Sequence, residues 1–178
     1  GLEYLTGYVS QDDAGAWQHH ALWAFGRADE RANFEAFVDF VMARWEANPE
    51  LHIYHYAPYE PAALKRLMGR YGSRENEIDR MLRAGLFVDL YAVVRNGIRA
   101  GVESYSIKKL EPLFGYVREK SMDTANLALS RLQANLELGQ PGEIPQSIKD
   151  DVEAYNKDDC LATLALRDWL EQIRANAI

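Results

Sequence analysis

Hydrophobic and polar residues alternate in two short stretches at the start of the chain. Residues 2–9 and 17–25 are rich in strand-forming side chains, and the polar segment 11–15 between them is typical of a turn. This pattern predicts a β-hairpin. A third apolar run, residues 51–56, ends at Ala57-Pro58 and predicts another strand. We expect the three strands to be neighbours in one sheet, with the first two antiparallel.

Helical spacing dominates the rest of the chain. From Asp29 to about Ala47, apolar residues recur every three or four positions, so they share one face of a helix. Another helix is expected after Pro58, with Pro61 in its first turn, where a missing N–H costs little. Further helices are predicted at residues 75–84, 87–95, 106–114, 122–138 and from 145 or 146 to 175. The order of elements predicts an α/β fold with a small mixed sheet flanked by helices.

Length and composition indicate an ordinary globular domain. The 178 residues, 48% hydrophobic and 26% charged, suit one domain covering residues 1–178. No run approaches the ~18 consecutive apolar residues of a membrane span, and the first residues do not resemble a signal peptide. The single cysteine, Cys160, is compatible with a reducing compartment, so we expect a cytoplasmic protein.

The net charge narrows the range of functions. The chain has a net charge of −7 and a pI near 5.1. Proteins that coat nucleic acid by neutralising its phosphates are usually basic, so this charge argues against such a function. Clustered carboxylates are nevertheless what a metal-dependent nuclease requires. The basic pairs Lys65-Arg66 and Lys108-Lys109 are most simply interpreted as solvated helix faces.

Two stretches carry candidate chemistry. One is His55-Tyr56-Ala57-Pro58-Tyr59-Glu60, which places a carboxylate just after a predicted strand, where open α/β sheets collect ligands. The other runs from Tyr155 to Cys160 in the last predicted helix. Tyr155 and Asp159 are four residues apart and therefore share a helix face. A phenol beside a carboxylate is able to hold an activated water.

Each candidate also has a purely structural interpretation. Glu60 suits the first turn of any helix, Asp89 suits a helix N-cap, and His55 suits a buried structural histidine. Asp158-Asp159 could belong to a solvated acidic face. Four histidines without regular spacing and one cysteine argue against a zinc site.

Taken in order, the stretches resemble the motifs of the DEDD 3′–5′ exonucleases of the RNase H-like superfamily. His55 to Glu60 is similar to the second motif, His-Asn-Ala-x-Phe-Asp, and Tyr155-Asn-Lys-Asp-Asp159 to the third, Tyr-x-x-x-Asp. Between them, residues 87–91 and 104–110 resemble the family's Asp-Thr-Leu segment and the Ser-Leu-x-x-Leu helix that follows it. The similarity is greater still to the RNase H-like domain of predicted RecB-type bacterial nucleases, which often accompanies a helicase module.

The chain also departs from the family pattern. The first motif, Asp-x-Glu, supplies two of the four metal-binding acids on the family's first strand, and no such motif stands in the corresponding place here. Residues 2–9 resemble the second strand instead, so we expect a domain that lacks its first strand. Glu60 replaces the usual aspartate, and Tyr56 replaces the usual asparagine.

The resemblance implies a nuclease that removes nucleotides from the 3′ end of DNA or RNA, with two Mg²⁺ or Mn²⁺ ions. It implies that Glu60 and Asp159 are metal ligands facing one cleft, that Tyr155 orients the nucleophilic water, and that Asp89 is an alternative ligand. His55, Lys108 and Lys109 are candidate substrate contacts. With so few acids, residues 1–178 should bind Mn²⁺ weakly and cut slowly or not at all.

Two other functions are open. The chain could be a nucleic-acid-binding or docking module with an RNase H-like fold and no activity, or a helical interaction domain whose acids are incidental. An Asp-x-Glu encoded immediately upstream of Gly1 would favour the enzyme, and the third function predicts no effect of divalent metal. Base- or sugar-reading residues cannot be identified in the sequence.

Overall fold

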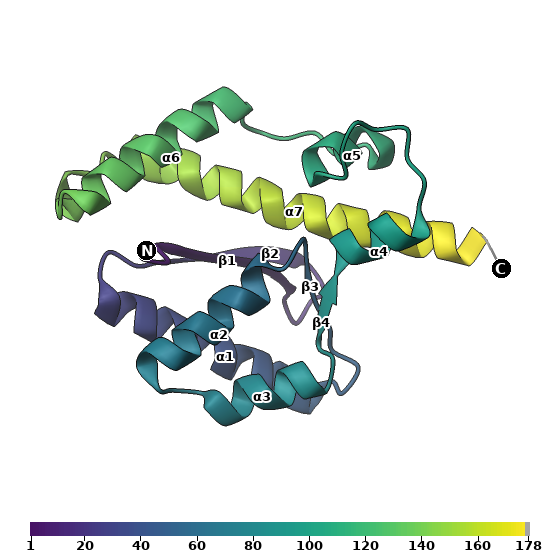
Figure 1. Ribbon diagram of the computed structural model, residues 1–178, viewed down its shortest axis with the longest axis horizontal. Coiled ribbons are helices and arrows are strands. Elements are labelled where there is room, and N and C mark those ends of the chain that lie inside the picture. The colour runs from purple at the N-terminus through teal and green to yellow at the C-terminus, as the bar shows by residue number, and fades with distance from the viewer. Residues whose placement is uncertain (177–178) are drawn as a thin grey trace. The chain divides into compact units, whose positions relative to one another are not determined.

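The computed structural model describes residues 1–176, the side chain of Met122 excepted. In this part of the chain, four strands and seven α-helices confirm the α/β class (Figure 1). The elements are β1 (Leu5–Gln11), β2 (Trp17–Trp23), α1 (Arg27–Ala47), β3 (Ile53–His55), α2 (Tyr59–Tyr71), α3 (Glu75–Arg83), β4 (Phe87–Asp89), α4 (Leu90–Gly97), α5 (Ile107–Phe114), α6 (Met122–Glu137), a 3₁₀ turn at Pro141–Glu143 and α7 (Gln146–Asn176). No helix among residues 1–176 is long and apolar enough to cross a membrane.

The chain divides into two compact units. Unit 1 comprises Gly1–Glu30 and Val117–Ala162, and unit 2 comprises Arg31–Tyr116 and the chain from Thr163 onward. Helices α1 and α7 each contribute residues to both units. The sequence-based expectation of one domain over residues 1–178 stays a prediction.

The predicted hairpin is confirmed in unit 1. Strands β1 and β2 are antiparallel, with Gly7 opposite Ala21. Asp12 shapes the turn, because its Oδ1 accepts hydrogen bonds from the backbone N–H of Ala14 and of Ala16, at 3.0 and 2.9 Å. These side-chain contacts reinforce the turn, which the backbone also closes with a hydrogen bond from the Gly15 N–H to the Asp12 carbonyl oxygen at 3.0 Å.

The third strand pairs differently from the prediction. β3 pairs with β4 in parallel, His55 opposite Asp89, in a two-stranded sheet separate from that of the hairpin. The expectation that residues 51–56 form one sheet with the hairpin is therefore wrong. So is the expectation of helix at residues 87–89, which are β4. A three-residue strand carries too little periodicity to be distinguished from a helix, and its partner is selected by tertiary contacts.

Unit 1 builds its core where α6 lies along the first part of α7 (Figure 1). Leu132 of α6 is fully buried against Ile148 and Val152 of α7, and Trp23 and Phe25 pack on the same cluster. Buried Glu30 is compensated here by an ion pair with Arg27 at 2.9 Å and by the backbone N–H of Glu3.

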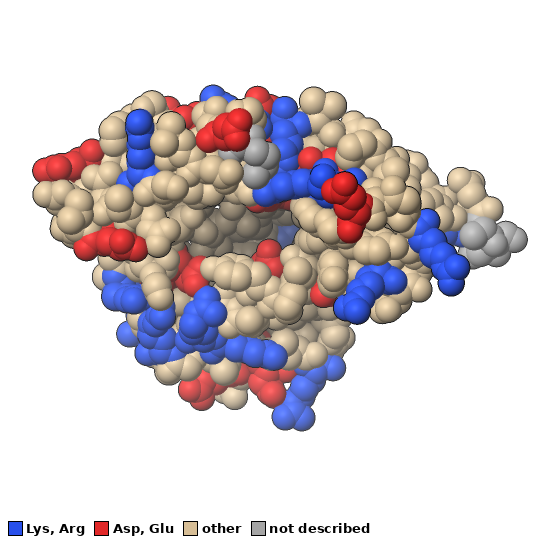
Figure 2. All heavy atoms as spheres, turned by 45° about the horizontal axis from the view of Figure 1, so that its top comes forward, with Lys and Arg blue, Asp and Glu red and all other residues tan. Residues whose placement is uncertain are grey.

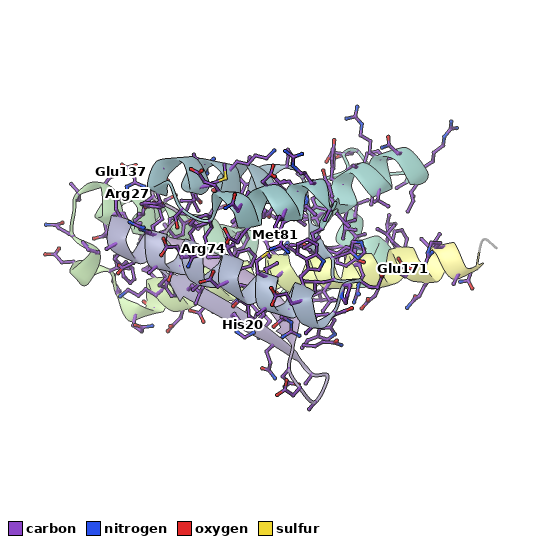
Figure 3. The ribbon with its side chains drawn as sticks, turned by 90° about the horizontal axis from the view of Figure 1, so that it is seen from below. His20, Arg27, Arg74, Met81, Glu137 and Glu171 are labelled. Carbon is purple, nitrogen blue, oxygen red and sulfur yellow. The ribbon has the colours of Figure 1, made fainter. Side chains whose placement is uncertain are left out.

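Unit 2 has two cores. In the first, α1, α2 and α3 bury the apolar face predicted for residues 29–47, with Phe34 and Met81 almost completely inaccessible. Arg74, between α2 and α3, forms a paired contact with Asp39 of α1 at 2.6 and 2.7 Å; Met81 and Arg74 are labelled in Figure 3. The second core joins α4 and α5 to the last part of α7. Its buried members are Leu90, Val94, Leu110 and Leu166.

Tyr56 secures the second core by a polar contact. Its hydroxyl donates a hydrogen bond to the carbonyl oxygen of Tyr105, and its ring meets that of Tyr91 edge to face. Burial raises the pKa of Tyr56 from 10.0 to about 12, with a smaller contribution from the neighbouring Tyr91 and Asp89. The phenol that replaces the family's asparagine is therefore a structural hydrogen-bond donor.

This shift predicts a pH dependence of stability. Because the pKa of Tyr56 is about 12 in the fold against 10.0 for an unburied phenol, its contribution is complete below pH 10 and is lost as the pH rises through about 12. We expect the wild-type protein to lose stability over this window, and Tyr56→Phe to lose less. Urea denaturation at stepped alkaline pH measures both. Equal slopes for the two proteins would contradict the assignment.

Candidate functional site

The second-motif stretch forms a tight loop at the end of β3. Ala57 adopts φ +67°, a conformation that costs a non-glycine residue energy and needs support. The support comes from both sides: Nδ1 of buried His55 lies 2.7 Å from the Ala57 carbonyl oxygen, and Asp89 Oδ1 accepts from the Ala57 N–H at 2.9 Å. Because a carbonyl only accepts, Nδ1 of His55 must carry the proton.

Asp89 is the N-cap of α4. The same Oδ1 that holds Ala57 accepts a hydrogen bond from the backbone N–H of Tyr91 at 2.9 Å. Asp89 thus connects the ends of the two parallel strands to the start of a helix. The N-cap interpretation is confirmed, whereas a role as metal ligand stays a prediction.

Glu60 stands in the first turn of α2, as predicted. Its side chain is 51% exposed, and Oε2 lies 3.7 Å from His55 Nδ1. The preceding residue, Tyr59, is 60% exposed. Unit 2 therefore presents a solvent-accessible carboxylate and an aromatic ring next to a loop that His55 and Asp89 hold in place.

The third-motif residues lie in unit 1, on one face of α7. The guanidinium of Arg118 contacts both of them: Nη2 is 2.8 Å from Asp159 Oδ1, and Cζ lies 5.5 Å from the centre of the Tyr155 ring. The i, i+4 spacing thus brings the phenol and the carboxylate together, as the sequence predicts. Arg118 itself was not predicted, because nothing in the local sequence distinguishes it from the other arginines of the chain.

Asp158 has a different role from its neighbour. It is buried, and its carboxylate accepts hydrogen bonds from the backbone N–H of Glu119 at 3.1 and 3.2 Å and of Lys120 at 3.4 Å. Lys120 also pairs with Asp151 at 3.0 Å, which raises the pKa of the lysine. Residues 118–120 are therefore fixed along α7 by Asp158.

A close approach of β1 and β2 to α7 completes unit 1. Asn156 Oδ1 lies 3.0 Å from Nε2 of His19, and the indole N–H of Trp23 donates to Glu153 at 2.8 Å. Gly7 makes this approach possible, because a Cβ at that position would lie 1.7 Å from Asn156 Oδ1.

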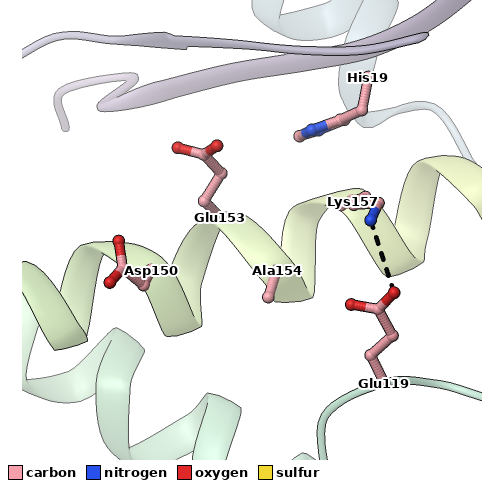
Figure 4. Close-up of a pocket in the computed structure, with 6 residues that line it drawn as sticks. All are labelled: His19, Glu119, Asp150, Glu153, Ala154 and Lys157. Carbon is pink, nitrogen blue, oxygen red and sulfur yellow. Dashed lines mark hydrogen bonds and ion pairs between the residues drawn. The ribbon is translucent and has the colours of Figure 1, made fainter.

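A shallow depression of about 230 Å³ opens beside these contacts (Figure 4). It is lined by His19, Glu119, Asp150, Glu153, Ala154 and Lys157. His19 and Glu153 project into the same space in Figure 4, and Lys157 pairs with Glu119 at 3.5 Å. The lining combines both signs of charge and includes neither Tyr155 nor Asp159.

The two predicted substrate lysines differ in their surroundings. Lys109 is exposed and pairs with Glu103 at 3.4 Å, whereas Lys108 is half-buried in the first turn of α5. Figure 2 shows Lys and Arg side chains in several groups, with Asp and Glu side chains near them. This distribution agrees with the acidic net charge.

The predicted site residues are thus divided between the units. His55, Glu60, Asp89, Lys108 and Lys109 belong to unit 2, and Tyr155 and Asp159 belong to unit 1. Their meeting in one cleft stays a prediction. Within residues 1–176, no three histidine, cysteine or acidic side chains are grouped closely enough to hold a metal ion. The described residues by themselves do not fit a complete divalent-metal centre.

Sequence comparison decides the family. A family model of the RNase H superfamily matches residues 1–171, which include all of unit 1, most of unit 2 and both motif stretches. This chain belongs to the RNase H superfamily. Comparison with curated proteins and with solved structures gives no match. An RNase H-like domain indicates a nuclease or nucleic-acid-binding function, and nucleases of this superfamily generally use divalent metals.

Proposed function

We propose that this RNase H-like domain belongs to a divalent-metal-dependent 3′–5′ exonuclease that acts on DNA or RNA. The observation that carries the proposal is the shared face of Tyr155 and Asp159 on α7, in a chain that a model of the RNase H superfamily matches over residues 1–171. Hydrolysis needs a positioned water and a nearby carboxylate. These two residues are of the right kinds and contact the same guanidinium.

The proposed roles follow the resemblance. Asp159 and exposed Glu60 serve as ligands of Mg²⁺ or Mn²⁺, which prefer oxygen donors, and Tyr155 orients the water. His55 and Asp89 hold the loop that carries Glu60, with Asp89 an alternative ligand, and Lys108 and Lys109 contact phosphate. A two-metal centre needs more acids than Glu60 and Asp159. An Asp-x-Glu encoded upstream of Gly1 would supply them, and the proposal includes a longer cytoplasmic polypeptide with a helicase module.

Degradation of 5′-labelled single-stranded DNA and RNA tests the proposal. With Mn²⁺ or Mg²⁺, a polypeptide that extends upstream of Gly1 and contains an Asp-x-Glu there should shorten the substrate stepwise from its 3′ end. Residues 1–178 alone should act slowly or not at all. In the extended polypeptide, Tyr155→Phe and Asp159→Asn should each lower the rate on the order of 10²-fold or more.

One result would contradict the exonuclease: hydrolysis that produces internal fragments or proceeds equally well on a 3′-blocked substrate. Robust activity of residues 1–178 alone would instead contradict the position expected for the first motif and show that it lies elsewhere. Arg83→Gln is a suitable control, because this exposed arginine lies at the end of α3, pairs with Asp79 and has no role in the proposal.

A non-catalytic nucleic-acid-binding module is the second candidate. This candidate is favoured because both carboxylates already have protein partners. Asp159 forms an ion pair with Arg118, and Asp89 accepts hydrogen bonds from two backbone N–H groups. Exposed Tyr59 and Lys65, Arg66 and Arg70 on α2 combine a stacking ring with cations, the chemistry that binds single strands. Salt-dependent binding by the extended polypeptide, without cleavage in either metal, would select this function.

A further inference from the structure

The chain from Arg95 to Lys109 is locally basic in an acidic protein. It contains Arg95, Arg99, Lys108 and Lys109 and a single acid, Glu103, whereas the whole chain has a net charge of −7. It comprises the last turn of α4, the loop that follows and the first turn of α5, all within unit 2. Residues 95–109 are called the α4–α5 segment below.

Burial along the α4–α5 segment separates apolar from polar side chains. Its apolar and aromatic residues are half-buried and pack on the second core of unit 2; they are Ile98, Ala100, Val102, Tyr105 and Ile107. Every exposed residue among residues 95–109 is polar or glycine. The exposed side chains that can donate hydrogen bonds are Arg95, Asn96, Arg99, Ser104, Ser106 and Lys109. The outward surface of the segment is therefore built mainly of donors.

Tyr105 brings the end of α4 and the start of α5 together. Its hydroxyl donates a hydrogen bond to the carbonyl oxygen of Ile98 at 3.2 Å and accepts one from the backbone N–H of Ala100 at 3.4 Å. Arg99 lies between these two residues, and Lys109 follows Tyr105 closely in the first turn of α5. Cations from both ends of the segment thus belong to one part of the surface.

Interactions within the protein do not account for these donors. Within residues 1–176, Arg95 and Arg99 form no ion pair, and Ser106, the N-cap of α5, makes no capping hydrogen bond with its side chain. Lys109 pairs with Glu103 at 3.4 Å, but both side chains are more than half exposed, and such pairs contribute little to stability. Lys109 also lies in the first turn of α5, where the helix macrodipole disfavours a cation. The stability of the fold therefore does not explain the local positive charge.

A phosphodiester backbone fits this surface. Contacts of proteins with nucleic-acid phosphates come largely from arginine, lysine, serine and asparagine side chains, which are the exposed donors of the segment. Interfaces with other proteins have an apolar core, and no side chain among residues 95–109 is both exposed and apolar. Gly97 and Gly101 leave open space where a Cβ would stand, so a phosphate can approach the chain closely.

We propose that the α4–α5 segment is a nucleic-acid-binding surface that holds the phosphate backbone without reading the bases, with Arg95 and Arg99 as its main contacts. The inference rests on the proposed function for the purpose of the binding and shares Lys109 with it. Binding itself requires neither hydrolysis nor a metal.

Binding of a fluorescently labelled oligothymidylate to the 178-residue chain, in the presence of EDTA, tests the inference. Anisotropy titrations at stepped salt give the dissociation constant and the slope of log K against log salt. The double variant Arg95→Gln/Arg99→Gln should raise the dissociation constant on the order of tenfold at about 0.1 M salt. It should reduce the magnitude of the slope by about 1.4, the value for two lost phosphate contacts on a single strand, or by about 1.8 on a duplex.

A change of opposite sign is expected at the one acid of the segment. Glu103→Gln should lower the dissociation constant about two- to threefold, because it removes a negative charge that repels phosphate and releases Lys109 from its ion pair. Unchanged or weaker binding by Glu103→Gln would contradict the placement of the strand on this surface.

Arg83→Gln is the matched control for Arg99→Gln. It changes the net charge by the same amount, but its exposed side chain lies at the end of α3 and pairs with Asp79. Arg99→Gln alone should reduce the slope by about 0.7 on the single strand, and Arg83→Gln should leave it unchanged. Equal losses in the two variants would indicate a general effect of net charge and overturn the inference.

Three further outcomes would also overturn it. One is the absence of salt-dependent binding by the wild-type chain. Another is a strong preference for one base sequence, which would show that bases are read. The third is displacement of the strand by poly-glutamate at equal concentration of charge, which would indicate an acidic protein as the partner.

The wild-type protein gives an independent answer if the double variant does not fold. Addition of the oligothymidylate should shift the Nε–H resonances of Arg95 and Arg99 and leave that of Arg83 in place. Unmoved resonances of Arg95 and Arg99 would refute the surface.

Failure of this inference can be distinguished from failure of the proposed function. Weaker binding by Arg95→Gln/Arg99→Gln, together with no hydrolysis by a polypeptide that contains an Asp-x-Glu upstream of Gly1, would support the surface and remove the exonuclease. Stepwise hydrolysis by that polypeptide, together with unchanged binding by the double variant, would retain the exonuclease and remove the surface.

Discussion

Replacing Asp158 with asparagine should lower the free energy of unfolding by about 2–3 kcal/mol, whereas the same change at Asp159 should cost about 1 kcal/mol or less. The two residues are adjacent and identical, so the difference comes only from their surroundings. Asp158 is 2% exposed and accepts backbone hydrogen bonds from Glu119 and Lys120. Even when its oxygen takes the position of Oδ2, which accepts from both residues, an asparagine there would turn its N–H₂ group toward the Glu119 N–H and leave a buried donor without an acceptor.

The Asp159→Asn variant should lose less stability than Asp158→Asn, because the surroundings of residue 159 accept an amide. Its side chain is 41% exposed, and an asparagine Oδ1 can still accept from Arg118. Urea denaturation of both variants in metal-free buffer measures the two costs. Hydrogen exchange gives a local check: the amides of Glu119 and Lys120 should exchange faster in Asp158→Asn only. Equal costs, or unchanged exchange, would show that Asp158 does not hold residues 118–120.

Replacing Gly7 with alanine should destabilise unit 1 by about 1–3 kcal/mol, the usual cost of forcing an extra methyl group into a packed site. The added Cβ would lie 1.7 Å from Asn156 Oδ1 and 2.4 Å from its Cγ, so the asparagine must move. Moving it breaks the contact between Asn156 and His19, which lies at 3.0 Å.

A double-mutant cycle isolates this contact. In an Asn156→Ala background, Gly7→Ala should cost much less, because the atoms that it meets are gone. Gly69→Ala is the matched control: nothing lies within 4 Å of its added Cβ inside α2, so it should stabilise by about 0.5–1 kcal/mol. Strict additivity of the Gly7 and Asn156 changes would refute the proposed contact.

The local chemistry of the site was largely predictable from the sequence. The i, i+4 spacing of Tyr155 and Asp159 places them on one face of any helix, and Arg118 does contact both. Glu60 follows a strand and enters a helix, as expected. Asp89 suited an N-cap and is one. These features depend on residues that are close together in the sequence, so the sequence pattern predicts them.

Contacts between distant segments were not predictable. Asp158 and Asp159 are both acids in one helix, and only the return of residues 118–120 to α7 makes one a buried acceptor and the other a partner of Arg118. Likewise, the need for a glycine at position 7 becomes clear only from the tertiary structure, in which Asn156, distant in the sequence, packs against it.

The sequence by itself determined the helices, the hairpin and the RNase H-like family, because periodicity, turn residues and ordered motifs are local or additive signals. Only the tertiary structure decided that β3 pairs with β4 in a sheet of its own, and that the third-motif carboxylate already has a guanidinium beside it. The physical reason is the same in both cases: three residues of strand and one arginine carry little preference of their own, and their partners are selected by what the rest of the chain brings within reach.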